Sequence, residues 1–249
     1  MLITSIQNNQ VKQWKKLHMR KFRMKTNSFL VEGFHLIEEA HKSGWEIETV
    51  IVEEGIAIPT WCNSYEVVYV TNHVFKEISQ TEQPQGIAAE VKMKALPNKD
   101  DKFVLLIDAI QDPGNLGTII RTADAAGFSK VILGKGTVDL YNDKVIRASQ
   151  GSIFHIPIVQ GDLIDEINAL KQKGVTIWAS ALEGAENYRE VQPSDKTAII
   201  VGNEGAGVHP SMIQLADNVV KIPIYGKAES LNVSIAAGIL MYQLRESKP

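Results

Sequence analysis

The sequence of 249 residues predicts an α/β protein with two domains, the second of which contains a parallel β-sheet. Short apolar runs alternate with amphipathic stretches along both halves, which is the pattern of alternating strands and helices. In the second half, FVLLI (103–107) is apolar at every position, as is typical of a strand buried on both faces of a parallel sheet. Between the halves, KALPNKDDK (94–102) is charged, contains Pro97 and lacks apolar periodicity, so we expect a linker there.

The first domain, expected at 1–93, is predicted to be a small α/β unit. Its amphipathic stretches indicate helices at FHLIEEAHKSG (34–44) and NHVFKEISQ (72–80). Its predicted strands are FLVEG (29–33), IETVIVEEG (47–55), YEVVYVT (65–71) and QGIAAEVKM (85–93).

The second domain is expected at 103–249. Further strands are predicted at KVILG (130–134), VTIWAS (175–180), TAIIVG (197–202) and VVKIPI (219–224), and helices at LGTIIRTADAA (116–126), DLIDEINALKQKG (162–174) and SLNVSIAAGILMYQLRE (230–246). In parallel sheets, ligands bind beyond the carboxyl ends of the strands. Three segments rich in glycine and small polar residues follow predicted strands, at 108–118, 202–208 and 225–232. We therefore expect one ligand site built from these three loops.

Composition narrows the class of protein. The chain is 44% hydrophobic and 22% charged, which is typical of a globular protein, and no apolar run reaches the roughly 20 residues that span a bilayer. The N-terminus lacks the apolar region of a secretion signal. Cys62 is the single cysteine, which excludes an internal disulfide and disfavours a cysteine-built metal site. We expect a cytoplasmic protein without a membrane partner.

A basic segment begins the chain, although the net charge of the whole is −3. Residues 1–31 contain no acidic residue and seven basic ones, which are Lys12, Lys15, Lys16, Arg20, Lys21, Arg23 and Lys25. Such a segment favours a polyanionic partner, because phosphate contacts supply most non-specific affinity for nucleic acid. Trp14, His18 and Phe22 recur every four residues and could stack on bases. Trp14, Leu17 and Phe22 could equally form the inner face of a basic helix, and we favour this core interpretation for the aromatics.

Several common site motifs are absent from the sequence. It contains no GxxxxGK[ST] loop and no GxGxxG after a strand, so binding of a nucleoside triphosphate or a dinucleotide has no support. The six histidines form no metal-ligand spacing, and we expect no metal. GxSxG is also absent, so a hydrolase nucleophile would have to be Ser230 or Ser234. A serine at the start of a helix is far more often an N-cap, and we favour that interpretation.

The three loop segments contain the candidate functional residues. In DAIQDPGNLGTIIRTADAAGF (108–128), Asn115 can cap the following helix and Gly127 can end it. Arg121 lies among apolar residues of this helix, where it could pair with Asp124 or present its guanidinium to a ligand. In VGNEGAGV (201–208), three glycines suit a loop that wraps a ligand, and Glu204 is the one charged residue, although a flexible turn is the simpler alternative.

Taken in order, these segments resemble the three signature motifs of the SpoU (TrmH-like) family of RNA ribose 2′-O-methyltransferases. NLGTIIRTADAAG is similar to the first motif, VGNEGAG to the second and IPIYGKAESLNVSIAAG to the third. KVIRASQGSIFHIPI (144–158) matches an intervening segment of the family. The resemblance covers about 103–245, and the first domain resembles, more loosely, the L30e-like substrate-binding domain that many members carry.

The resemblance implies a parallel-sheet SPOUT domain with a deep trefoil knot, an exception to the rule against knots. It also implies S-adenosylmethionine as cofactor, a homodimer as the active unit, and no metal. By motif position, the cofactor would contact Gly202, Asn203, Gly205, Ile222, Ser230 and Leu231, largely through backbone atoms. The catalytic set would be Asn115, Arg121, Glu204, Ser230 and Asn232.

Arg121 would lie at the ribose hydroxyl. Because a guanidinium stays protonated at neutral pH and is a very poor base, we expect it to orient the hydroxyl and stabilise developing negative charge. RNA would be bound by Lys12, Lys15, Lys16, Arg20, Lys21, Arg23 and Arg147. The two-domain layout favours 23S ribosomal RNA as substrate. The alternatives are a transfer RNA ribose 2′-O-methyltransferase and a non-catalytic RNA-binding protein that retains the knot fold.

Overall fold

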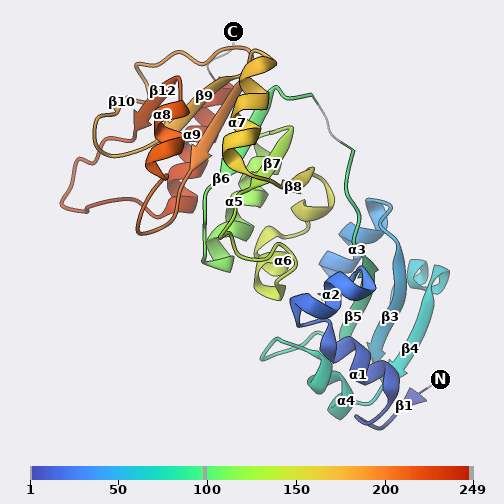
Figure 1. Cartoon of the computed structure of the whole chain (residues 1–249). Coiled ribbons are helices and arrows are strands. Elements are labelled where there is room, and N and C mark those ends of the chain that lie inside the picture. The colour runs from blue at the N-terminus through green and yellow to red at the C-terminus, as the bar shows by residue number, and fades with distance from the viewer. Residues whose placement is uncertain (1, 98–99, 247–249) are drawn as a thin grey trace. The chain divides into compact units, whose positions relative to one another are not determined.

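The computed structural model describes residues 2–97 and 100–246. The chain forms two compact units, one made of residues 1–94 together with 139–154, and the other of 95–138 together with 155–249. Figure 1 labels the elements of both. The expected domain boundary at 94–102 stays a prediction, and its residues 98–99 lie outside the described part of the chain, as do residues 1 and 247–249 of the two expected domains. Residues 139–154 belong to the first unit by their contacts, although they lie within the expected second domain in the sequence.

The first unit contains a five-stranded mixed sheet in the order β1-β4-β3-β5-β2. β1, β4 and β3 are parallel, whereas β5 runs antiparallel to both of its neighbours. The four strands predicted in this region are confirmed, and the two-residue β1 was missed because so short a strand has no recognisable period. The bounds are β1 Leu2–Ile3, β2 Ser28–Glu32, β3 Ile47–Glu53, β4 Glu66–Val70 and β5 Ile87–Lys92.

Helices pack on this sheet with their apolar sides. Val11 and Trp14 of α1 and Leu17 after it are buried against α4 and strands β3 and β4. The core interpretation of Trp14 and Leu17 is therefore confirmed, while Phe22 is only half-buried. The helices of this part are α1 Asn9–Lys16, α2 Arg20–Thr26, α3 Phe34–Lys42, α4 Asn72–Ile78 and the 3-10 turn η1 Thr60–Ser64.

Residues 139–154 add α6 (Asp143–Ser149) and the 3-10 turn η2 (Ser152–Phe154) to the first unit. Aromatic contacts attach this segment to the sheet. The rings of Tyr141 and Phe29 lie 4.5 Å apart, those of Phe154 and Trp45 lie 5.2 Å apart, and the Trp45 indole donates to the Phe154 carbonyl at 3.2 Å. The side chain of Arg23 is buried and binds Asp139.

The second unit contains a seven-stranded sheet in the order β10-β12-β9-β11-β6-β7-β8, parallel at every pairing. The predicted parallel-sheet class is confirmed, and the trefoil knot stays a prediction. β12 ends at Lys221, earlier than predicted, because Pro223 has no N–H to donate to a neighbouring strand. The bounds are β6 Phe103–Ile107, β7 Lys130–Leu133, β8 Ile158–Gln160, β9 Thr176–Ser180, β10 Glu186–Asn187, β11 Thr197–Val201 and β12 Asn218–Lys221.

Helices cover this sheet in two pairs. α5 packs against α9, which also contacts β11, whereas α7 packs against α8 and β9. Val104 and Leu106 of β6 contribute to the core around α7, and the alternation of side chains along a strand directs the neighbouring β6 residues to the opposite face. Gly127, with φ +69°, follows α5 as predicted. The bounds are α5 Pro113–Ala125, α7 Leu163–Gln172, α8 Pro210–Leu215 and α9 Val233–Glu246.

In the parts of the chain that the structure describes, no helix combines the length and the apolar character needed to cross a bilayer.

Candidate active site

A cavity of about 480 Å³ opens in the second unit beside the loops that follow β9, β11 and β12. These strands are neighbours in the sheet, so the ends of their loops meet at one edge. All six residues predicted to contact the cofactor line this cavity, namely Gly202, Asn203, Gly205, Ile222, Ser230 and Leu231. The structure thus brings together segments that lie up to 29 positions apart, from Gly202 to Leu231.

The loop after β11 is held tightly closed. Asn203 and Gly207 exchange two backbone hydrogen bonds, of 3.0 and 2.9 Å. The Asn203 side chain accepts from the backbone N–H of Gly205 and Ala206 and donates to the Ala109 carbonyl at 2.8 Å. A Cβ atom on Gly202 would lie 2.1 Å from backbone atoms of the returning loop, so this position requires glycine. The loop is therefore an ordered wall rather than the flexible turn considered as an alternative.

Glu204 joins the three loop segments through a short chain of hydrogen bonds. Its carboxylate accepts from the Asn115 side chain at 3.1 Å and from the backbone N–H of Asp112 and Gln111 at 3.1 and 3.3 Å. The side-chain oxygen of Asn115 in turn accepts from the side-chain NH₂ group of Asn232 at 3.0 Å. Side-chain and backbone groups from the three segments therefore fix one another beside the cavity.

The environment of Glu204 keeps its carboxylate ionised. Partial burial acts to raise its pKa, but hydrogen bonds from Asn115 and from backbone N–H groups outweigh this effect, so the pKa lies below its usual value. The carboxylate is a fixed acceptor at neutral pH.

Two helix caps differ from the expected ones. The side chain of Asp112, and not that of Asn115, caps α5 by accepting from the Asn115 backbone N–H at 2.8 Å. Asn232 caps α9, because its side-chain oxygen accepts from the N–H of Ser234 at 2.9 Å. The N-cap interpretation of Ser230 is therefore wrong. α9 begins at Val233, which places Ser230 in the loop that lines the cavity.

Arg121 does not join this network within one chain. It lies on an exposed side of α5 and is absent from the described residues that line the cavity. Arg121 follows Asn115 by six positions, which corresponds to about 240° around a helix, so the two side chains leave α5 in different directions. Asp124, the alternative partner of Arg121, binds His155 at 3.1 Å.

One part of the cavity wall was missed from the sequence. Ser180, Ala181, Leu182 and Glu183 line the cavity from the loop after β9. VTIWAS was correctly predicted as a parallel strand, so the rule that ligands bind beyond strand ends already pointed to this loop. The segment lacked the glycine-rich composition on which the three other loops were selected.

The basic residues predicted to bind RNA separate into two groups. Lys12, Lys15, Lys16, Arg20 and Lys21 are exposed on α1 and α2. Arg23 is buried, with 5% of its surface exposed, and donates to the carbonyls of Leu17 and His18 as well as to Asp139. This leaves no accessible face for a phosphate, so the RNA contact predicted for Arg23 does not fit the structure. Arg147 is half-buried and pairs with Asp143 at 2.6 Å.

Both parts of the chain match known protein families. Residues 102–242 match the SpoU rRNA Methylase family, and residues 8–89 match the MRM3-like substrate binding domain. The chain belongs to the SpoU rRNA methylase family. The family and the enzyme class expected from the three motifs are therefore confirmed.

Relatives match along the whole length of the chain. The 23S rRNA (guanosine(2553)-2′-O)-methyltransferase RlmP of Bacillus subtilis is 47% identical, with 98% of each chain covered. The 23S rRNA (uridine(2479)-2′-O)-methyltransferase of Streptomyces viridochromogenes is 30% identical, over 97% of this chain and 90% of that one. The crystal structure of an AdoMet-bound rRNA methyltransferase from Sinorhizobium meliloti aligns with a TM-score of 0.88 at 33% identity, over 99% of this chain and 97% of that one.

The cavity fits S-adenosylmethionine in its chemistry. Its walls combine the glycine positions Gly202 and Gly205 with apolar side chains such as Ile222 and Leu231, which suits a neutral adenosine. A side chain at Gly202 would collide with backbone of Gly207 and Val208, so glycine at this position allows the loop to close beside the cavity.

Proposed function

We propose that this protein transfers a methyl group from S-adenosylmethionine to a ribose 2′-hydroxyl of 23S ribosomal RNA. The observation that carries this proposal is the convergence of all six expected cofactor-binding residues on one cavity, next to the Glu204 network. Relatives that match over both units are named as 23S rRNA 2′-O-methyltransferases, which supports the substrate. A ribosomal RNA substrate also supports a cytoplasmic location.

The cofactor supplies an electrophilic methyl group on a sulfonium, so the chain itself must position the hydroxyl and manage its proton. Gly202, Ile222 and Leu231 would hold the adenosine from the cavity wall. Asn115, Glu204 and Asn232 would fix the geometry of the three loops, because the Asn115 side chain is hydrogen-bonded to both Glu204 and Asn232. Ser230 would shape the substrate side. Positioning of this kind can lower a barrier by several kcal/mol.

Arg121 would orient the hydroxyl and an adjacent phosphate of the RNA and stabilise negative charge that develops on the oxygen. Since Arg121 is exposed and is not among the described residues that line the cavity of its own chain, we propose that it acts at the cavity of a second copy in a homodimer. Exposed apolar side chains on α9, such as Ile235 and Tyr242, which are 55% and 46% exposed, support a contact surface on this unit. Light scattering on the purified chain tests the dimer, and a monomer would contradict it.

The test is transfer of labelled methyl from S-adenosylmethionine to RNA isolated from a strain that lacks the gene, with Arg121→Ala in parallel. We expect label in 23S ribosomal RNA at one alkali-resistant linkage. The variant should lose at least about 100-fold in rate, because removing one transition-state donor typically costs this much, while its affinity for S-adenosylmethionine stays unchanged. Label in transfer RNA would overturn the substrate. No label in any RNA, together with no cofactor binding, would overturn the enzyme assignment.

A further inference from the structure

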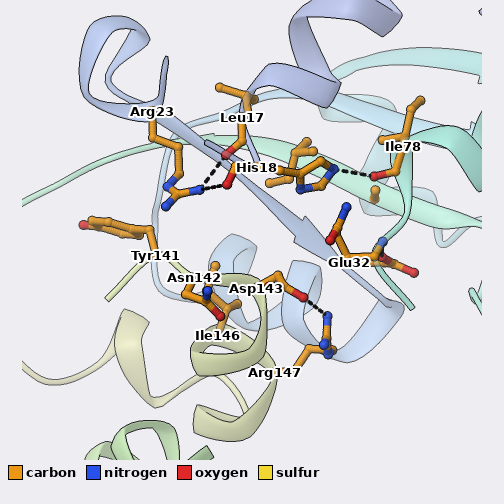
Figure 2. Close-up of a pocket in the computed structure, with 13 residues that line it drawn as sticks. Leu17, His18, Arg23, Glu32, Ile78, Tyr141, Asn142, Asp143, Ile146 and Arg147 are labelled. Atoms are coloured by element: carbon orange, nitrogen blue, oxygen red, sulfur yellow. Dashed lines mark hydrogen bonds and ion pairs between the residues drawn. The ribbon is translucent and has the colours of Figure 1, made fainter. Parts of the chain in front are cut away.

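The first unit contains a second cavity, of about 200 Å³, which shares no residue with the cofactor cavity. Figure 2 shows the side chains of the α6 segment facing His18 across it. Its walls come from the turn between α1 and α2, from β2, from the end of α4 and from α6, all within the first unit. Leu17, His18, Leu30, Glu32, Gln80 and Asn142 are among the lining residues.

His18 presents a hydrogen-bond acceptor in this cavity. Its Nε2 lies 2.7 Å from the Ile78 carbonyl, and because a carbonyl can only accept, Nε2 must carry the hydrogen. Burial lowers the pKa of His18, although the bond to Ile78 acts in the opposite direction, so the ring is neutral at pH 7. In a neutral ring with hydrogen on Nε2, the remaining Nδ1 is an acceptor.

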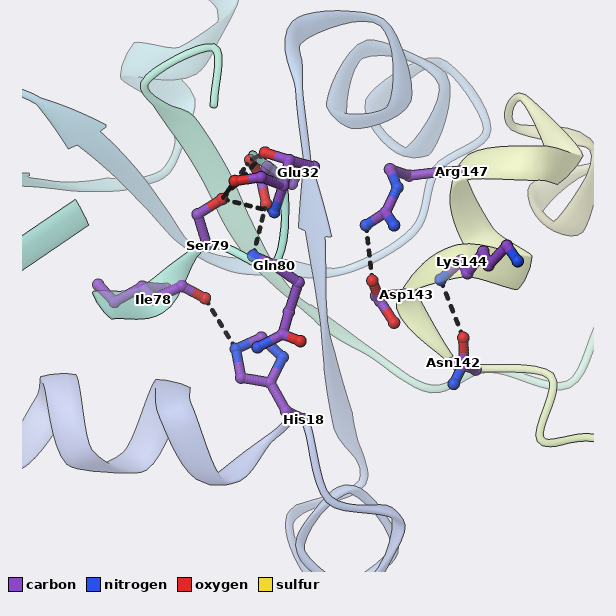
Figure 3. A network of polar contacts seen from close by, with 10 residues as sticks. His18, Glu32, Ile78, Ser79, Gln80, Asn142, Asp143, Lys144 and Arg147 are labelled. Atoms are coloured by element: carbon purple, nitrogen blue, oxygen red, sulfur yellow. Dashed lines mark hydrogen bonds and ion pairs between the residues drawn. The ribbon is translucent and has the colours of Figure 1, made fainter. Parts of the chain in front are cut away.

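Glu32 supplies a second acceptor with a fixed orientation. As Figure 3 shows, its carboxylate is held by residues that follow α4. One oxygen accepts from the hydroxyls of Ser79 and Thr81, and the other accepts from the Gln80 backbone N–H at 3.4 Å. A carboxylate has about four lone-pair sites, so this arrangement leaves acceptor capacity for a ligand.

Amide groups add further polar contacts at the rim. The Gln80 side chain is exposed, and the Asn142 side-chain oxygen accepts from the Lys144 backbone N–H at 2.9 Å, so that the Asn142 NH₂ group can donate. Apolar side chains, among them Leu17, Leu30 and Ile146, complete the walls.

The charges of the cavity do not suit a phosphate. Arg23 is bound to Asp139, and Arg147 is bound to Asp143 at 2.6 Å, so both guanidinium groups are already neutralised. Glu32 remains as a net negative charge. Apolar walls with acceptors at one edge match a flat, uncharged heterocycle that carries N–H groups.

The position of the cavity links it to RNA. Leu17 and His18 belong to the turn between α1 and α2, the two helices that present the exposed cations Lys16, Arg20 and Lys21. Sequence-specific contacts to RNA are made mostly to unstacked bases, which are stacked or hydrogen-bonded by side chains. Phosphates on the exposed cations would be bound by residues that lie close in sequence to residues lining the cavity.

We propose that this cavity receives one unstacked base of the RNA substrate, and that His18 and Glu32 accept N–H groups on the base edge. The proposal rests on the proposed function, because it takes RNA as the substrate. The two acceptors select bases with an exocyclic amino group over uracil, which offers one N–H. The first unit therefore reads the identity of a base in addition to the charge of the backbone.

RNA affinity of two variants provides the first test, measured on the full chain across a range of salt. Leu30→Phe enlarges a lining side chain and so fills part of the cavity, and Gln80→Ala removes an exposed amide at its rim. We expect RNA binding to weaken roughly 10-fold with Leu30→Phe and less with Gln80→Ala, since a single base contact contributes on this scale. The matched controls are Ile164→Phe and Gln172→Ala, exposed positions on α7.

The salt dependence identifies the kind of contact. Because a base carries no counterions, the slope of log affinity against log salt should stay unchanged in the cavity variants. Replacing Lys16, Arg20 and Lys21 by glutamine should reduce both the affinity and the slope. Cavity variants that bind RNA like their controls, or that change the slope as the lysine and arginine replacements do, would overturn the proposal.

Nucleosides provide the second test and do not depend on catalysis. With S-adenosylhomocysteine saturating the cofactor cavity, guanosine, adenosine and cytidine should shift the backbone amide NMR signals of His18, Gln80 and Arg147, uridine should shift them less, and Leu30→Phe should abolish the effect. Shifts with inorganic phosphate alone would overturn the base assignment. Absence of methyl transfer to any RNA, together with the expected nucleoside shifts, would instead contradict the proposed function alone, so the two failures are distinguishable.

Discussion

The two units use charged residues in opposite ways. In the second unit, Glu204 is exposed and is held by the Asn115 amide and two backbone N–H groups, and none of its hydrogen-bond partners among the described residues is a cation. In the first unit, Arg23 is buried and bound to a carboxylate that lies 116 positions away in the sequence. A charged residue in a basic or polar segment therefore has no fixed role. Its surroundings decide whether it orients a site, meets a ligand or maintains the fold.

The largest expected effect concerns the buried ion pair. Arg23→Met leaves the Asp139 carboxylate, which is 18% exposed, without its partner. Breaking a buried pair from one side typically costs about 3–5 kcal/mol. Urea unfolding should show a loss of this size in the free energy of unfolding of the first unit. Arg20→Met, at an exposed position of the same helix, is the control and should change stability by less than about 0.5 kcal/mol. Equal stability of the two variants would remove the contrast between the units.

A smaller effect is expected at the glycine that closes the cofactor loop. A Cβ on Gly202 would meet backbone of Gly207 and Val208 at 2.1 Å, so Gly202→Ala must displace the loop. Overpacking costs about 1–3 kcal/mol, and the affinity for S-adenosylmethionine should fall at least about 10-fold in calorimetric titration. Gly226→Ala is the control, because a Cβ there meets no atom within 4 Å. If both variants bind the cofactor equally well, the loop backbone is not part of its site.

The smallest effect concerns the pH dependence of Glu204. Its pKa is lowered in the folded protein, so its ionised form contributes stability above the ordinary value of 4.5, and this contribution is lost as the pH falls through the folded pKa. Glu204→Gln should therefore be less stable than the parent at pH 7, by less than about 1 kcal/mol because the side chain is exposed, and the difference should vanish in acid. Thermal unfolding at pH 7 and pH 3 measures both. A stability difference that grows in acid would contradict the lowered pKa of Glu204.

Most of the second unit could be predicted because its longer strands and its loops each have a recognisable pattern within a short stretch of sequence. Each long strand is a continuous apolar run, and the loops that follow β11 and β12 carry glycine and small polar residues, so the cavity could be located from strand ends. β8 and β10 were missed, since two or three residues have no measurable period. The cap of α9 was assigned to Ser230, and not to Asn232, because several polar residues precede that helix and only the backbone geometry separates them.

The role of Arg23 could not be predicted, for a physical reason. Its partner Asp139 lies in a segment that the order of elements assigned to the other domain, and no local pattern indicates which distant carboxylate a basic residue will meet. The same holds for the cavity of the first unit, where His18 and Glu32 face Asn142 only because the chain returns to this sheet.

Because residues 139–154 return to the first unit, the protein cannot be divided into its two units by one cut in the sequence. The polypeptide passes from one unit to the other three times, near residues 94, 138 and 154, so the methyltransferase half is not a contiguous fragment. A gene truncated to begin at residue 95 would encode Tyr141 and Phe154 without Phe29 and Trp45, whose rings they contact in the intact chain. We expect such a fragment to aggregate. A shortened enzyme, or a chimera carrying another recognition domain, would have to replace residues 139–154 as well.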